Sequence, residues 1–169
     1  MKAKVEVKDK ELQNIIKKVR GIGAHYVKVG VIDGKSDNRD DKLSPSLIAA
    51  SNEFGTKKIP ERSFMRSTMG EQKNAYNKIL KLIANDVLYN KKSLSQLLGK
   101  LGLRVERDIK KKITDITEPP NAPSTIRAKQ NKRMKSANKK WETPKPLIDT
   151  GQMRASIIHV VEKGSIKKK

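Results

Sequence analysis

The chain of 169 residues has no cysteine, few aromatic residues and no long apolar run. Without cysteine it can form no disulfide, no thiolate nucleophile and no cysteine-based metal site. Aromatic residues make up only 4% of the chain, so it lacks the interleaved rings on which single-stranded nucleic acid stacks. No apolar stretch approaches the ~20 residues of a membrane span, and the first residues lack the apolar core of a signal peptide. We therefore expect neither a membrane anchor nor a secretory leader.

Acidic residues are also scarce relative to basic ones. Lys and Arg number 39 and Asp and Glu 18, which gives a net charge of 39 − 18 = +21. Clustered basic groups bind phosphate by releasing counterions, whereas a lysine-rich solvated surface keeps a subunit dispersed before assembly. The basic residues are spread over the whole chain and mixed with acids, which favours the second interpretation for most of them.

The sequence offers no recognisable catalytic, cofactor or metal site. Both histidines, His25 and His159, lie within strand patterns, and no nucleophile elbow or glycine-rich phosphate loop occurs. The four aspartates between residues 33 and 41 do not have the spacing of a calcium-binding EF-hand loop. We interpret residues 33–44 as a solvated loop and expect the protein not to be an enzyme.

Periodicity predicts the secondary structure. Alternating apolar residues predict short strands at Val5–Val7, Tyr26–Ile32 and Ile157–Glu162. Apolar residues at three- and four-residue steps predict a helix over Lys10–Arg20, capped by Asp9, and two long helices between Glu71 and Ile116. These elements predict an α+β fold, in which a small, mainly antiparallel sheet packs against two long helices with extended loops.

We expect one structural domain over residues 1–163, with mobile loops at 33–44 and 129–146 and a disordered basic tail at 164–169. Within the second long helix, Gly99 and Gly102 each cost about 1 kcal/mol relative to alanine. They indicate either a local bend or close packing of another backbone, and we favour close packing.

The stretch "IAASNEFGTKKIPERSFMRST" (48–68) is where we expect the fold to be organised. Ser44 is a suitable N-cap and Pro45 suits the first helical position, while Gly55 can adopt the left-handed conformation that ends a helix. The only two phenylalanines, Phe54 and Phe64, lie within this stretch. They predict a turn that folds back onto the core.

A second stretch, "PLIDTGQMRASI" (146–157), predicts a short helix. Asp149 or Thr150 would cap it, with Gln152 reaching back. The strand that follows is almost entirely apolar, so it is buried on both faces or covered by a neighbouring subunit on one. A pairing of Asp149 with Arg62 or Arg154 would hold the two stretches together.

A dense basic tract precedes the second stretch. After one helical turn at Ser124–Lys129, we expect an exposed loop held by Trp141. The tract is the best candidate for contact with DNA or an acidic partner, and a flexible solvated loop is the alternative. Its basic residues are Lys129, Lys132, Arg133, Lys135, Lys139 and Lys140.

Taken together, the two stretches resemble signature segments of the tail-completion and neck (minor tail, head–tail joining) proteins of long-tailed bacteriophages. The resemblance covers roughly residues 26–161, although Ser63 and Ser67 stand where proline is expected. The structural and interface residues that it implies are Glu53, Phe54, Gly55, Pro60, Arg62, Phe64, Arg66, Leu147, Asp149, Thr150, Gly151, Met153 and Arg154.

The resemblance implies a structural virion protein that forms a ring, with six copies favoured, at the neck or tail top. Expected partners are copies of itself, the connector or stopper, and the tail terminator or tail tube, with channel DNA as a non-specific contact and no membrane. It would lie in the host cytoplasm during assembly. The alternative is a sequence-independent nucleic-acid-binding protein that uses the basic loop at residues 129–140.

Overall fold

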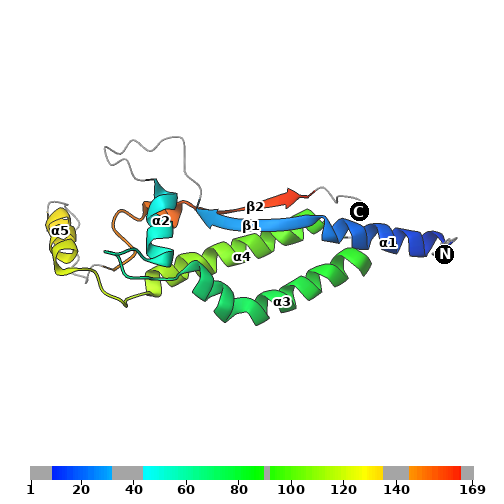
Figure 1. Cartoon of the computed structure of the whole chain (residues 1–169). Helices are drawn as coiled ribbons and strands as arrows, with labels where there is room; N and C mark the ends of the chain where they lie inside the picture. The colour runs from blue at the N-terminus through cyan, green and yellow to red at the C-terminus, as the bar shows by residue number, and fades with distance from the viewer. Residues whose placement is uncertain (1–8, 32–43, 90–91, 135–144, 165–169) are drawn as a thin grey trace. The chain divides into compact units, whose positions relative to one another are not determined.

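The computed structural model describes residues 9–31, 44–89, 92–134 and 145–164. Figure 1 shows the elements of this part of the chain. Helices pack against a two-stranded antiparallel sheet of β1 and β2, which confirms the predicted α+β class. The predicted strand Val5–Val7, residues 33–43 and the tail from residue 165 lie outside the described residues. The element bounds are α1 Lys10–Gly23, β1 His25–Val31, α2 Pro45–Phe54, α3 Met65–Tyr89, α4 Leu94–Asp115, α5 Pro123–Met134, α6 Gln152–Ala155 and β2 Ile157–Lys163.

The chain divides into two compact units, each of which is built from separate stretches of sequence. Of the described residues, the first unit holds 9–28, 73–103 and 159–164, and the second holds 29–72 and 104–158. The helices α3 and α4 and both strands contribute residues to both units. The expectation of a single domain over residues 1–163 stays a prediction.

In the first unit, α1 begins where the sequence predicts. The side chain of Asp9 accepts a hydrogen bond from the backbone N–H of Glu11 at 2.8 Å, which caps the helix. The Nζ of Lys18 donates to the carbonyl of Leu88 at 2.8 Å and so ties α1 to the end of α3. Between the strands, Glu162 accepts hydrogen bonds from Tyr26 at 2.7 Å and from Lys28 at 2.8 Å.

The two glycines of α4 differ in their surroundings. A Cβ built on Gly102 would lie 2.7 Å from Cγ of His159 and 2.9 Å from Cγ2 of Val27, whereas one on Gly99 would meet nothing within 4 Å. Close packing is therefore present at Gly102, but against two side chains rather than against another backbone as predicted. The prediction is wrong at Gly99, where the helix faces open space.

This difference predicts opposite effects of one substitution at the two positions. Gly102→Ala should lower the free energy of unfolding by about 1–3 kcal/mol, because the added methyl overpacks the site between α4 and the strands. Gly99→Ala should be neutral or stabilising by up to about 1 kcal/mol, because it only improves helix propensity. Urea unfolding followed by circular dichroism measures both, and equal destabilisation by the two variants would contradict this packing.

Exposure along β2 decides between the two alternatives for that strand. Ile157 is completely buried, whereas Ile158 and Val160 are each 39% exposed. Burial on both faces is therefore wrong, because one face of the strand carries solvent-exposed apolar side chains. The second alternative, cover by a neighbouring subunit, stays a prediction.

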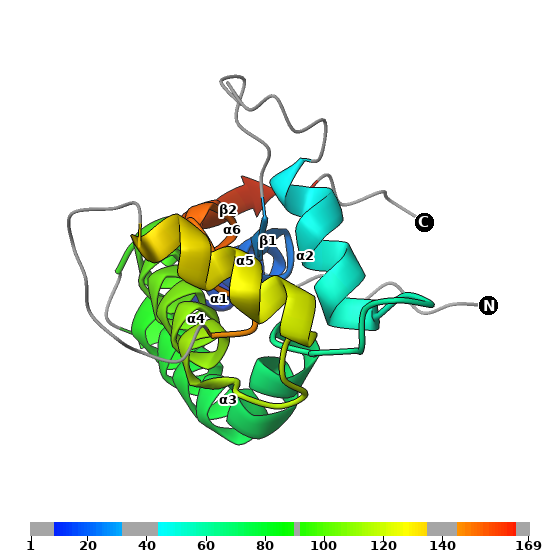
Figure 2. The same ribbon diagram turned by 90° about the vertical axis from the view of Figure 1, so that its left-hand side faces the viewer.

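The second unit has its own core, in which Phe64, Ile113, Ile157 and Pro45 are the largest fully buried side chains. Within this unit α2 packs against α6. Residues 129–134 are helical rather than a loop, because α5 continues from Pro123 to Met134 (Figure 2, yellow). Proline at the first helical position and a run of good helix formers explain this difference.

Candidate functional site

The chain reverses direction at the end of α2, so that the first signature stretch (residues 48–68) folds back on itself. Ser44 caps α2 by accepting from the N–H of Leu47 at 3.2 Å. Gly55 follows with φ 72° and ψ 171°, a positive φ as predicted but an extended ψ in place of the left-handed helical value. Backbone hydrogen bonds then close the turn, from Thr56 to Ile59 and from Arg62 to Asn52, each 2.7 Å long.

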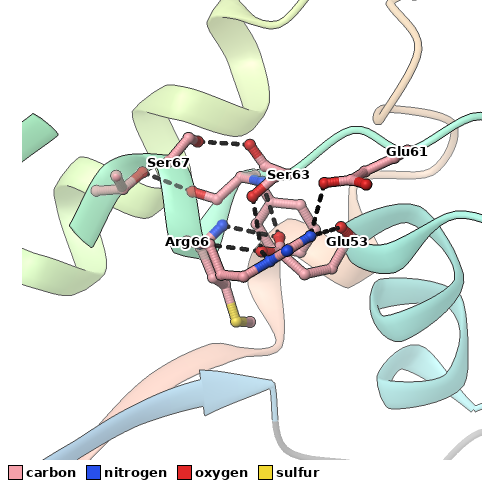
Figure 3. Close-up of polar contacts among 8 residues, drawn as sticks. Glu53, Glu61, Ser63, Arg66 and Ser67 are labelled. Carbon is pink, nitrogen blue, oxygen red and sulfur yellow. Dashed lines mark hydrogen bonds and ion pairs between the residues drawn. The ribbon is translucent and has the colours of Figure 1, made fainter. Parts of the chain in front are cut away.

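This reversal brings the carboxylate of Glu53 to the start of α3 (Figure 3). One oxygen accepts from the N–H groups of Phe64 at 2.8 Å and Met65 at 2.9 Å. The other accepts from the N–H of Arg66 and the hydroxyl of Ser63, both at 2.9 Å. A residue of one helix therefore satisfies the first N–H groups of the next, which have no partner within their own helix.

The Glu53 side chain is only 5% exposed. Burial on its own raises the pKa of this carboxyl, but the hydrogen bonds from Met65, Arg66, Phe64 and Ser63 outweigh burial and lower the pKa below the ordinary value. The charged form is therefore the one that the site holds. It also lies at the N-terminus of α3, where the helix dipole favours a negative charge.

Arg66 closes this cluster from the solvent side. Its guanidinium donates to the Glu53 carboxylate at 3.1 Å, to the Glu53 carbonyl at 2.7 Å and to the carboxylate of Glu61 at 2.7 Å. It also lies 4.7 Å from the ring centroid of Phe54. The hydrogen bond to Glu53 is the main cause that raises the pKa of Arg66.

Arg62 ties the same turn to the segment that follows α4. Its guanidinium donates to the carbonyls of Pro119 at 2.7 Å and Pro120 at 2.8 Å, and to the side chain of Asn52 at 3.4 Å. The residue is 5% exposed, and burial lowers the pKa of its guanidinium. Arg62 therefore holds three separate stretches of the second unit together, mainly through main-chain acceptors.

The two phenylalanines have different roles. Phe64 is completely buried and anchors the turn as predicted, but Phe54 is 65% exposed, so its predicted place in the core is wrong.

Ser63 and Ser67 also have clear roles where the resemblance leads one to expect proline. Ser63 donates to Glu53, and Ser67 donates to the carbonyl of Ser63 (Figure 3).

The second signature stretch lies beside the first, because it contains α6, which packs against α2. Leu147 and Met153 are each 7% exposed and belong to the core. The N-cap of α6 is Gly151 at φ 80°, which has no side chain to cap the helix. Of the two predicted capping residues, Thr150 accepts a hydrogen bond from the N–H of Gln152 at 3.4 Å, while capping by Asp149 stays a prediction.

Arg154 donates to the carbonyl of Lys110 at 3.2 Å. This contact ties the second stretch to α4. The pairing of Asp149 with Arg62 or Arg154 stays a prediction. Of the remaining residues in the first stretch, Pro60 lies exposed in the turn.

The first residue of the basic tract is held inside the second unit. The ammonium of Lys129 donates to the carbonyls of Lys145 at 2.9 Å, Pro146 at 3.3 Å and Ile148 at 2.8 Å. These three bonds match its three N–H donors, so Lys129 ties α5 to the second signature stretch. Lys132 and Arg133 lie on α5, whereas Lys135, Lys139, Lys140 and Trp141 lie outside the described residues.

Sequence reasoning missed the role of Glu53 as a cap, because its partners lie ten to thirteen residues further along the chain. It also missed an acid-free segment on α3, between Glu71 and Asp86, although that signal is visible in the sequence.

Within the described ranges, no group of three or more His, Asp or Glu could hold a metal ion. None of the described helices is both long and apolar enough to cross a membrane.

The contacts of Glu53, Arg62 and Arg66 join the end of α2, the start of α3 and the segment after α4. No protein-family model, no curated protein and no solved structure matches this chain.

Proposed function

We propose that the protein is a structural component of the neck or tail top of a long-tailed bacteriophage and forms a ring there without catalysing a reaction. One observation carries this proposal: two distant signature stretches, both similar to those of tail-completion proteins, meet in one unit where α2 packs against α6. The buried cap at Glu53 and the carbonyl contacts of Arg62 make that unit rigid. A subunit that transmits a fixed geometry to its neighbours needs such rigidity.

The outer face of α2 provides a surface for a neighbouring copy. Leu47 is 51% exposed and Phe54 65% exposed, and they lie two turns apart on the same side of the helix. Arg66 lies over the Phe54 ring and orients it. Contact between this face and a different face of the next copy is heterologous, and a closed heterologous contact generates a ring.

The proposal is tested by measuring the mass of the purified protein with native mass spectrometry and sedimentation velocity. We expect a closed homo-oligomer, with six copies favoured. The double substitution Leu47→Ser and Phe54→Ser should yield monomers that are still folded. The control Leu82→Ser removes a side chain on α3 that is also 65% exposed, and it should leave the ring intact.

In a virus that encodes the chain, purified virions should contain it, and its loss should leave heads and tails that do not join. A chain that stays monomeric at all concentrations and is absent from virions would overturn the proposal. The alternative nucleic-acid function at residues 129–140 has less support, because Lys129 is held by main-chain carbonyls.

A further inference from the structure

One face of α3 carries cations and amides without any acid. The face opposite to it buries Tyr76, Ile83 and Val87. The residues of this face, which include two adjacent pairs, recur at three- and four-residue steps along the helix, and all of them are exposed. We call this set the α3 stripe, and its members are Lys73, Asn74, Asn77, Lys78, Lys81 and Asn85.

The charge of the α3 stripe is not compensated within the described part of the chain. The nearest acids along α3 are engaged elsewhere, since Glu71 pairs with Lys112 and Asp86 pairs with Lys92. Among the described residues, the side chains of the stripe lysines take part in no hydrogen bond or ion pair. Within the ranges that the structure describes, the stripe is therefore a line of ammonium groups without a carboxylate partner, separated by amide donors.

The exposed cations of α4 differ from those of the α3 stripe because they are paired with carboxylates. Arg104 and Arg107 both pair with Asp108, and Lys111 pairs with Asp115. These residues are also exposed cations on a long helix, but each has a carboxylate within ion-pair distance. The two helices therefore offer a matched comparison between free and compensated positive charge.

We propose that the α3 stripe binds the sugar–phosphate backbone of duplex DNA without reading its sequence. Lysine ammonium and asparagine amide groups are both common donors to phosphate oxygens. From Lys73 to Asn85 the stripe runs about 18 Å along the helix, which spans several nucleotides at ~3.4 Å each along one strand. Leu80 and Leu82, which are 43% and 65% exposed, flank the stripe on the same helix, so an anionic lipid surface is the competing occupant that the experiment must exclude.

This inference does not depend on the proposed ring. A single folded chain presents the whole stripe, so DNA binding by a monomer tests the stripe and leaves the ring untested. A ring that ignores DNA would equally leave the structural role intact.

The experiment measures fluorescence anisotropy of a labelled, mixed-sequence DNA duplex with the full chain over a salt series. The stripe variant is Lys73→Gln, Lys78→Gln and Lys81→Gln, and the control variant is Arg104→Gln, Arg107→Gln and Lys111→Gln. Both change the net charge equally, from +21 to 21 − 3 = +18. Circular dichroism establishes that both variants are folded.

We expect the wild type and the control to bind with similar salt dependence. The stripe variant should bind at least about tenfold more weakly, and its log–log salt slope should be shallower by about 2.7, because each lost phosphate contact removes about 0.9. Equal losses in both variants would show that net charge alone is responsible and would overturn the proposal. A wild type that does not bind the duplex would also overturn the proposal. So would stripe substitutions that weaken binding to phosphatidylglycerol vesicles but leave binding to the duplex unchanged.

Discussion

Replacing Glu53 by alanine is expected to lower the free energy of unfolding by about 3–5 kcal/mol, because several N–H donors lose a charged acceptor and each such loss costs about 1–3 kcal/mol. The substitution leaves the N–H groups of Phe64, Met65 and Arg66 without their acceptor at the start of α3. Each buried donor that loses its partner costs its own desolvation energy. Because whole domains are stable by only about 5–15 kcal/mol, the loss is large.

Two further variants test whether the loss of stability comes from the buried cap at Glu53. Glu61→Ala removes another carboxylate that contacts Arg66, but this ion pair is more than half exposed at both ends. It should therefore cost no more than about 1 kcal/mol. Glu53→Gln keeps one acceptor oxygen but loses the charge, so it should fall between the two. Equal unfolding midpoints in urea for Glu53→Ala and Glu61→Ala would show that the cap does not stabilise the unit.

The same carboxylate predicts how stability depends on pH. The folded-state pKa of Glu53 is lower than its unfolded-state value, so the unfolded chain takes up the proton first as the pH falls. The stability that Glu53 contributes is complete above the ordinary glutamate pKa and is lost as the pH falls through the lowered, folded-state pKa. The difference in unfolding free energy between wild type and Glu53→Gln should therefore be constant near neutrality and shrink in acid. A difference that grows on acidification would contradict the sign of this pKa shift.

Sequence patterns predicted the elements that are determined by interactions between residues close together in the sequence. The cap at Asp9 and the apolar period after it define α1, and Ser44 and Gly55 bound α2. In these places the hydrogen-bonding partner lies within a few residues, so the chain nearby determines the structure. The basic tract differs from its prediction for a related reason: its charge density is typical of a loop, whereas the local helix propensity of residues 123–134 forms α5.

Features that depend on distant contacts could not be predicted. Gly99 and Gly102 look equivalent in the sequence, and only the packing of His159 and Val27 distinguishes them. Phe54 and Phe64 likewise differ only because the turn between them reverses the chain, which buries one ring and exposes the other. Glu53 lies in the stretch that the sequence singles out, but its contact with the start of α3 joins two helices and follows from the fold.

The second large effect is expected at Gly55, the residue that makes this reversal possible. With φ 72° and ψ 171° it occupies a backbone region that is essentially restricted to glycine. A Cβ at this position would also lie 2.9 Å from the backbone nitrogen of Glu61 and 3.2 Å from the carbonyl oxygen of Ile59. Gly55→Ala therefore combines backbone strain with a clash against main-chain atoms that cannot rotate away, and it should cost about 3 kcal/mol or more.

Two other glycines separate these causes. Gly151 has φ 80° but a methyl there would meet nothing within 4 Å, so Gly151→Ala should cost only the strain, about 1–2 kcal/mol. A methyl on Gly70, inside α3, would also meet nothing within 4 Å, and Gly70→Ala should stabilise by up to about 1 kcal/mol. Urea unfolding should rank the three variants in this order. If Gly55→Ala costs no more than Gly151→Ala, the close approach of residues 59–61 does not exist in solution, and the turn that delivers Glu53 to α3 must be built differently.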